Sequence, residues 1–320
     1  MIPSRSGSAV ALTALVAVAL LSASGPLAPA HAQQTPRGLV GSAVAAQEPH
    51  ASVEPATPGV TSKAIANVKR AAATATDIFR RVPCLSPKGV AKTVRALPRI
   101  ARKLAEHKPV TIIAFGSSST EGYGSTAPEF TYPSRLAAQL KRKYPTADIK
   151  VLNRGKGGED APEMLHRLKR AVIDEKPDLV IWQVGTNAIL RNLDATATIA
   201  QVEEGISRIQ AAGADVVLVD PQYVPAVNQK GESASRMVQL LNKVAGQRHI
   251  GIFPRFAVMR DWHEKQALAF DRFSIADGLH MNDWGYACFA QLLGDDIIRS
   301  VGQVQRGINA SSDVLVYQPL

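Results

Sequence analysis

Two short segments, far apart in the chain, carry the residue types that acyl transfer requires. Three serines at 117–119 follow an apolar run over residues 110–115. Asp277 and His280 stand three residues apart near the C-terminus. A serine hydroxyl is a weak nucleophile, and it becomes reactive when a histidine, oriented by a carboxylate, removes its proton. These residue types therefore predict a nucleophilic site built from serine, histidine and aspartate.

Two further segments lie between these and are rich in possible hydrogen-bond donors. The first is the stretch over residues 153–158, which contains Gly155, Gly157 and Gly158. The second, over residues 184–187, ends at Asn187. Backbone N–H groups and side-chain amides can stabilise the negative charge that develops on the substrate oxygen during acyl transfer. The two segments could therefore supply an oxyanion hole.

The four segments, in this order, resemble the blocks of the SGNH hydrolases, also called the GDSL esterase/lipase family. The resemblance implies that Ser118 is the nucleophile, that His280 is the base and that Asp277 orients it. It further implies an oxyanion hole formed by the backbone N–H groups of Ser118 and Gly158 and the side-chain amide of Asn187. A glycine at position 158 would let the backbone approach the oxyanion closely.

The resemblance covers about residues 110–301 and departs from the family pattern at two positions. Ser117 stands where the family has the aspartate of Gly-Asp-Ser, and Ala188 stands where the aspartate of Asn-Asp is usual. Both missing aspartates are supporting residues in the family. We therefore expect the chemistry to be retained, while the subfamily and the substrate stay open.

Each candidate also has an alternative interpretation. Ser118 and Asn187 could simply cap helices, and Gly158 could be an ordinary turn residue. His263, close to Asp261, could replace His280 as the base. The sequence thus predicts an exported ester hydrolase that acts on an acylated carbohydrate or lipid. The alternative is a non-catalytic cell-envelope-binding protein that has kept the scaffold.

Elements that could position these residues alternate along the chain from residue 108. Apolar runs typical of strands cover residues 110–115, 149–152, 179–184, 216–219 and 250–253. Helical patterns cover residues 133–143, 161–175, 196–212, 233–245 and 286–300. The alternation predicts a three-layer α/β/α sandwich with a five-stranded parallel sheet, flavodoxin-like. The candidates then converge at the carboxyl ends of the strands.

The N-terminal part has the features of a targeting segment. Arg5 precedes an apolar run over residues 9–21, and Ala30-His31-Ala32 fits a cleavage site. We expect a signal peptide over residues 1–32, cleavage near Ala32 and export to the periplasm or the exterior. An N-terminal membrane anchor is the alternative. Residues 33–60 are expected to form a disordered linker, and residues 303–320 a C-terminal tail.

A basic segment precedes the predicted catalytic domain of residues 108–302. The whole chain has a formal net charge of +10, and residues 63–108 contain twelve Lys or Arg against two carboxylates. Apolar spacing predicts an amphipathic helix over residues 65–82 within a helical extension, residues 61–107. A second helix is expected near its end, interrupted or kinked at Pro98. Its basic face is either solvated or attracted to an anionic cell-envelope surface, whereas nucleic acid is not expected.

Cys84 and Cys288 are the only cysteines. In an oxidising compartment the two are expected to form a disulfide, with two independent thiols as the alternative. The sequence contains no metal-binding cluster of Cys and His and no Walker-type phosphate loop, so no cofactor is implied.

Overall fold

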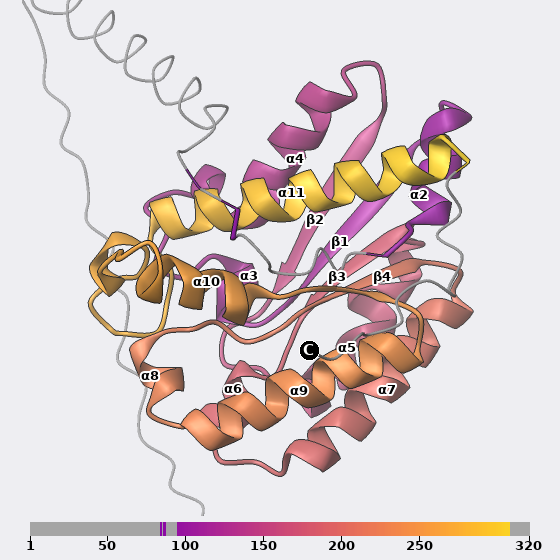
Figure 1. Cartoon of the computed structure of the whole chain (residues 1–320). Coiled ribbons are helices and arrows are strands. Elements are labelled where there is room, and N and C mark those ends of the chain that lie inside the picture. The colour runs from indigo at the N-terminus through magenta and orange to yellow at the C-terminus, as the bar shows by residue number, and fades with distance from the viewer. Residues whose placement is uncertain (1–83, 85, 88–94, 308–320) are drawn as a thin grey trace, which may run out of the picture. The chain divides into compact units, whose positions relative to one another are not determined.

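Five parallel strands form the centre of the computed structural model, which describes residues 84, 86, 87 and 95–307 (Figure 1). Their order in the sheet is β2-β1-β3-β4-β5, and every neighbouring pair is parallel. The strands are β1 (Val110–Gly116), β2 (Ile149–Gly155), β3 (Leu179–Gln183), β4 (Asp215–Val219) and β5 (Gly251–Phe253). The order reverses between β1 and β3, and open α/β sheets form their crevices outside the carboxyl ends of strands at such a point.

Helices cover both faces of the sheet (Figure 1). One layer contains α2 (Pro98–Ala105), α4 (Tyr132–Lys143) and α11 (Asp283–Gln305). The other contains α5 (Ala161–Ala171), α7 (Ala195–Ala211) and α9 (Gly231–Gln247). The remaining helices are α3 (Ser118–Glu121), α6 (Thr186–Leu190), α8 (Pro225–Asn228), α10 (Arg255–Glu264), and the 3-10 turns η1 (Pro128–Phe130), η2 (Ile173–Glu175) and η3 (Phe270–Arg272).

The apolar strand sequences are explained by burial on both faces. All five residues of β3 are buried, and in β1 only Thr111 is partly exposed. Ile113, Ile181 and Val217 are fully buried in the centre of the sheet. Because both faces of a parallel sheet are covered, its central strands are continuous apolar runs rather than alternating patterns. The three-layer fold expected from the sequence is confirmed.

The differences from the expected elements concern helix ends and short helices. Pro98 does not interrupt or kink a helix, because it is the first residue of α2. A proline fits there, since the first helical N–H has no intrahelical partner to lose. The helix expected over residues 161–175 ends at Ala171 and is followed by the turn η2. The helices α3, α6, α8 and α10 were not expected.

Several expectations concern residues outside the described part of the chain. These are the signal peptide, the linker, the helix over residues 65–82 and most of the C-terminal tail. The division of the chain into domains therefore stays a prediction. In the described part, no helix is long and apolar enough to cross a membrane.

Candidate active site

The serine of the first segment lies in a turn that is held from the neighbouring strand. Strand β1 ends at Gly116, and Ser118 is the first residue of α3. The Oε1 atom of Gln183 accepts hydrogen bonds from the N–H of Ser117 at 2.9 Å, from its hydroxyl at 3.1 Å and from the hydroxyl of Thr120 at 3.3 Å. Gln183 ends β3 and is buried. The turn around Ser118 is therefore fixed to two adjacent strands.

Asp277 and His280 lie in the loop that enters α11, and they reach Ser118 in a single hydrogen-bonded row. His280 Nδ1 is 2.6 Å from Asp277 Oδ2, and His280 Nε2 is 2.8 Å from Ser118 Oγ. The other carboxylate oxygen of Asp277 accepts the N–H groups of Leu279 and His280, each at 2.9 Å. The structure thus brings together residues 162 positions apart in the chain.

The electrostatics of Asp277 suit the orientation of an imidazole. Partial burial works to raise the pKa of this carboxyl, but the hydrogen bonds from the ring and N–H of His280 and from the N–H of Leu279 outweigh it, so the pKa lies below its ordinary value. An ionised carboxylate beside Nδ1 favours the tautomer with its proton on Nδ1. Nε2 is then free to accept the proton of the Ser118 hydroxyl.

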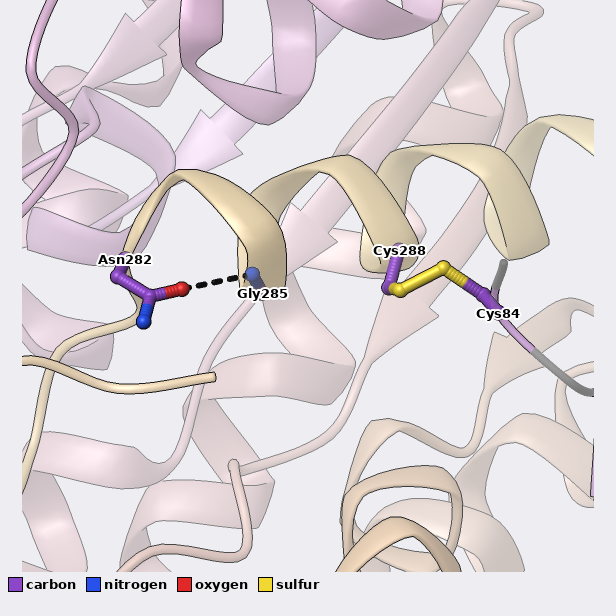
Figure 2. Close-up of a disulfide and its surroundings, with 4 residues drawn as sticks. All are labelled: Cys84, Asn282, Gly285 and Cys288. Carbon is purple, nitrogen blue, oxygen red and sulfur yellow. Dashed lines mark hydrogen bonds between the residues drawn. A yellow bond between two sulfur atoms is a disulfide. The ribbon is translucent and has the colours of Figure 1, made fainter. Parts of the chain in front are cut away.

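The loop that carries the pair is closed at its base. The N–H of Ile275 donates to the carbonyl of His280 at 2.9 Å. Asn282 caps α11 by accepting the N–H of Gly285 at 2.9 Å, as Figure 2 shows, and its amide donates to the carbonyl of Asp271 at 3.0 Å. These bonds define where the loop ends and the helix begins, and they fix His280 relative to α11.

A disulfide joins Cys84 to the same helix (Figure 2). Cys288 is fully buried in the second turn of α11. The Cα atoms of the two cysteines are 5.5 Å apart. The bond links positions separated by 204 residues. It therefore attaches the segment before α2 to the helix that starts directly after the candidate site.

The three donors that the family resemblance implies have hydrogen-bonding capacity to spare. Gly158 adopts a φ of +76°, a left-handed conformation that glycine tolerates best. Within the described chain, the N–H groups of Ser118 and Gly158 donate to no other residue. The Nδ2 of Asn187 donates one hydrogen bond, to the carbonyl of Glu159 at 2.7 Å. An amide nitrogen has two hydrogens, so a second donor remains on Asn187.

The turn that contains Gly158 packs closely against α3 through Gly155 and the carboxylate of Glu121. A Cβ atom at Gly155 would lie 2.0 Å from the backbone nitrogen of Glu121, so only glycine permits this approach. The carboxylate of Glu121 accepts the N–H of Gly157 at 2.9 Å. The guanidinium of Arg191 donates to the carbonyl of Gly158. The turn is thus held by bonds to two separate segments of the chain.

The competing candidate for the base, His263, lies away from Ser118. His263 is in α10, where its Nδ1 is 2.9 Å from the carbonyl of Leu268 and its ring stacks on Phe270 at 3.9 Å. Its neighbour Asp261 bonds with Gln266 instead. His263 therefore has no contact with Ser118, and its pairing is structural.

Sequence reasoning missed two residues at this site. Gln183 was interpreted as part of an apolar strand end, although it is the acceptor that fixes the serine turn. The available signal was a single amide at the end of an apolar run. Tyr123, whose ring centroid is 4.4 Å from that of His280, gave no signal because the two are distant in sequence. In the described residues, no group of three or more His, Cys, Asp or Glu could hold a metal ion.

Comparisons with known proteins agree with this fold. The model of the non-GDSL lipase-like family matches residues 83–303. An arylesterase from Vibrio mimicus is 22% identical over 188 residues, which cover 59% of this chain and 88% of that protein. An acetylxylan esterase from Geobacillus stearothermophilus has a TM-score of 0.50 at 18% identity, covering 60% of this chain and 94% of its own. A two-domain esterase active on acetylated mannans has a TM-score of 0.54 at 20% identity, and the match covers 72% of this chain and 58% of that protein.

These findings confirm the resemblance to the SGNH hydrolases, and the relatives they name are esterases. The absence of an aspartate at position 117 agrees with a family that lacks the Gly-Asp-Ser-Leu signature. The family match covers well over half of the chain. The chain therefore belongs to the non-GDSL lipase-like family.

Proposed function

We propose that the chain hydrolyses esters by nucleophilic catalysis at Ser118. The observation that carries this proposal is the row of hydrogen bonds from Asp277 through His280 to the Ser118 hydroxyl, at 2.6 and 2.8 Å. Each member has the partner its role requires, since the carboxylate faces one ring nitrogen and the hydroxyl faces the other. The esterase relatives support the same reaction class.

Acylation begins when Ser118 Oγ attacks the carbonyl carbon of the ester. His280 Nε2 takes the hydroxyl proton, and the charge of the resulting imidazolium is stabilised by Asp277. Negative charge then develops on the carbonyl oxygen, where the N–H groups of Ser118 and Gly158 and the amide of Asn187 stabilise it. His280 returns the proton to the departing alcohol oxygen, and an acyl-serine remains.

Deacylation repeats these steps with water in place of the hydroxyl. His280 removes a proton from water, the resulting oxygen attacks the acyl carbon, and the same donors stabilise the second oxyanion. The bond between the acyl carbon and Ser118 Oγ then breaks as His280 returns the proton to Oγ. The sum is one ester and one water converted to one acid and one alcohol.

The substrate class that we propose is an acylated carbohydrate, with a short acyl group such as acetyl. Two of the structural neighbours are described as acting on acetylated xylan and acetylated mannans.

We propose further that the protein works outside the cytoplasm after cleavage near Ala32. Its basic segment, residues 63–108, would then face an anionic envelope surface. N-terminal sequencing of exported protein tests the cleavage.

Turnover of 4-nitrophenyl acetate by purified protein tests the catalytic proposal. We expect hydrolysis by the natural chain, its loss in Ser118→Ala, and labelling of Ser118 alone by a phosphonofluoridate probe. Ser119→Ala is the matched control, because this buried neighbour is not part of the hydrogen-bonded row of Asp277, His280 and Ser118. Labelling of Ser117 or Ser119 would contradict the assignment of the nucleophile. No turnover by the folded natural chain would instead favour a non-catalytic binding protein.

A further inference from the structure

A basic hollow opens beside the proposed oxyanion hole. Its volume is about 800 Å³. It is lined by Lys156, Gly157, Gly158, Glu159, Pro162, Glu163, His166, Arg167, Arg170 and Arg191. One of the lining residues, Gly157, is next to the nucleophile, since a Cβ atom built at Gly157 would lie 3.9 Å from the Cβ atom of Ser118. A group bound at this end of the hollow is close enough to Ser118 to be part of the same molecule as the ester being attacked.

The two carboxylates in the hollow are already engaged. Glu159 is almost fully buried and bonds with Arg167 Nε at 2.5 Å, with Lys156 at a longer 3.5 Å. Glu163 bonds with its own helix end, at the N–H of Asp160, and lies 3.7 Å from Arg191. Each carboxylate therefore has a protein partner and a neighbouring cation that offsets its charge.

The cations outnumber these carboxylates, and all of them except Arg167 are accessible. The side chain of Lys156 is 69% exposed and that of Arg191 is 46% exposed, although both come from segments that hold the oxyanion turn. Arg170 is exposed on α5 and has no carboxylate within ion-pair distance among the described residues. The hollow therefore carries a net positive charge, with at least one guanidinium whose donors are free.

We propose that this hollow is a subsite for an anionic group of the ester substrate, a carboxylate carried on its alcohol or its acyl part. Guanidinium groups bind carboxylates through paired N–H donors, and an ammonium adds a compact charge. The position beside Gly158 places the anion next to the reacting carbonyl rather than far along the chain of a polymer. This inference rests on the proposed function, and it narrows the substrate class to acidic esters.

Matched pairs of esters test the subsite. One pair is 4-acetoxybenzoate and its methyl ester, which differ by a charge on the alcohol part. The other is mono-4-nitrophenyl succinate and its methyl ester, which differ by a charge on the acyl part. The measured quantity is the ratio of kcat/KM for the charged ester to that for the neutral one, so that intrinsic reactivity cancels between variants.

We expect the ratio for at least one pair to fall in the double variant Lys156→Glu, Arg170→Glu by roughly three- to tenfold, since each exposed ion pair contributes little alone. The pair that responds identifies whether the anion is borne by the alcohol or the acyl part. Lys243→Glu, an equal charge change at an exposed position of α9, is the control and should leave both ratios unchanged.

Salt provides a second measurement that needs no variant. In the natural chain the responding ratio should fall as sodium chloride rises from about 0.02 to about 0.5 M, because exposed charges are screened over this range. Hydrolysis of all four esters with ratios that neither salt nor the double variant changes would overturn the subsite and leave the esterase intact. Hydrolysis of none of them would overturn the proposed function, and the subsite with it.

Discussion

Aspartates stand at both ends of the sheet, and their surroundings differ. At the amino ends of the strands, Asp178 accepts the N–H of Thr111 at 2.9 Å and pairs with Arg99 and Lys103 at 2.7 and 2.9 Å. Asp215 accepts two N–H groups at the start of α2. At the carboxyl ends, Asp277 bonds only within its own loop and to His280.

The two ends of the sheet differ in whether hydrogen-bond donors are left without a partner. Asp178 and Asp215 bond to residues of α2, and the effect of these bonds is to hold α2 against the sheet. The bonds of Asp277 continue through His280 to the Ser118 hydroxyl, where the backbone N–H of Ser118 donates to no described residue. Unused donors next to a connected nucleophile distinguish a site for chemistry from a structural anchor.

The largest expected effect separates the two ends by activity. His280→Ala should lower kcat/KM for 4-nitrophenyl acetate by about 10⁴-fold or more, close to the effect of removing the nucleophile, because triad members act as a unit. Asp277→Ala should cost less, since part of the orientation is recoverable. Neither variant should change the melting temperature much, because both side chains are partly exposed. A greater loss from His263→Ala would contradict the assignment of the base.

The next largest effect tests Asn187 as a donor of the oxyanion hole. Asn187→Ala should lower kcat by roughly 10²- to 10³-fold with a smaller change in KM, as expected for a donor that acts in the transition state. Steady-state kinetics with 4-nitrophenyl acetate measure both constants. A melting curve is the control, because Asn187 also bonds to the carbonyl of Glu159. Normal kcat with a large rise in KM would make Asn187 a residue for substrate binding instead.

The sequence predicted the carboxyl end of the sheet better than the amino end. Apolar runs identified all five strands, and the motif order brought Ser118, Asp277 and His280 to one edge because parallel strands end together. The bonds of Asp178 to Arg99 and Lys103 join residues more than 70 positions apart and have no local pattern. The same holds for Gln183 and the serine turn. Such side-chain pairings depend on the assembled layers, and a single sequence does not encode them as a motif.

The amino end should respond in stability rather than activity. Burial works to raise the pKa of Asp178, but bonds from Thr111, Lys103 and Arg99 hold it below its ordinary value. Asp178→Ala should lower the free energy of unfolding by about 2 kcal/mol, mainly because the Thr111 N–H loses its acceptor while the two cations can be hydrated. Urea unfolding measures this, and kcat should be unchanged. The control Asp174→Ala breaks an exposed pair with Lys169 and should cost under about 0.5 kcal/mol.

The smallest effect concerns the pH dependence of Asp215. Burial raises its pKa from 3.8 to about 6, although the N–H groups of Ile100 and Arg99 favour the ionised form. Between these two values the folded chain binds more protons than the unfolded chain, so stability should fall as pH rises. With partial solvent access, we expect a contribution of about 1 kcal/mol to that fall.

Asp215→Asn isolates this contribution. Its amide oxygen can still accept the two N–H groups at the start of α2, but the side chain no longer titrates. The difference in free energy of unfolding between variant and natural chain should therefore shift in favour of the variant between about pH 4 and pH 6, and stay constant above. Urea unfolding at several pH values measures the difference. A constant difference across that range would mean that Asp215 titrates normally in the folded chain, and that the bonds at the start of α2 outweigh its burial.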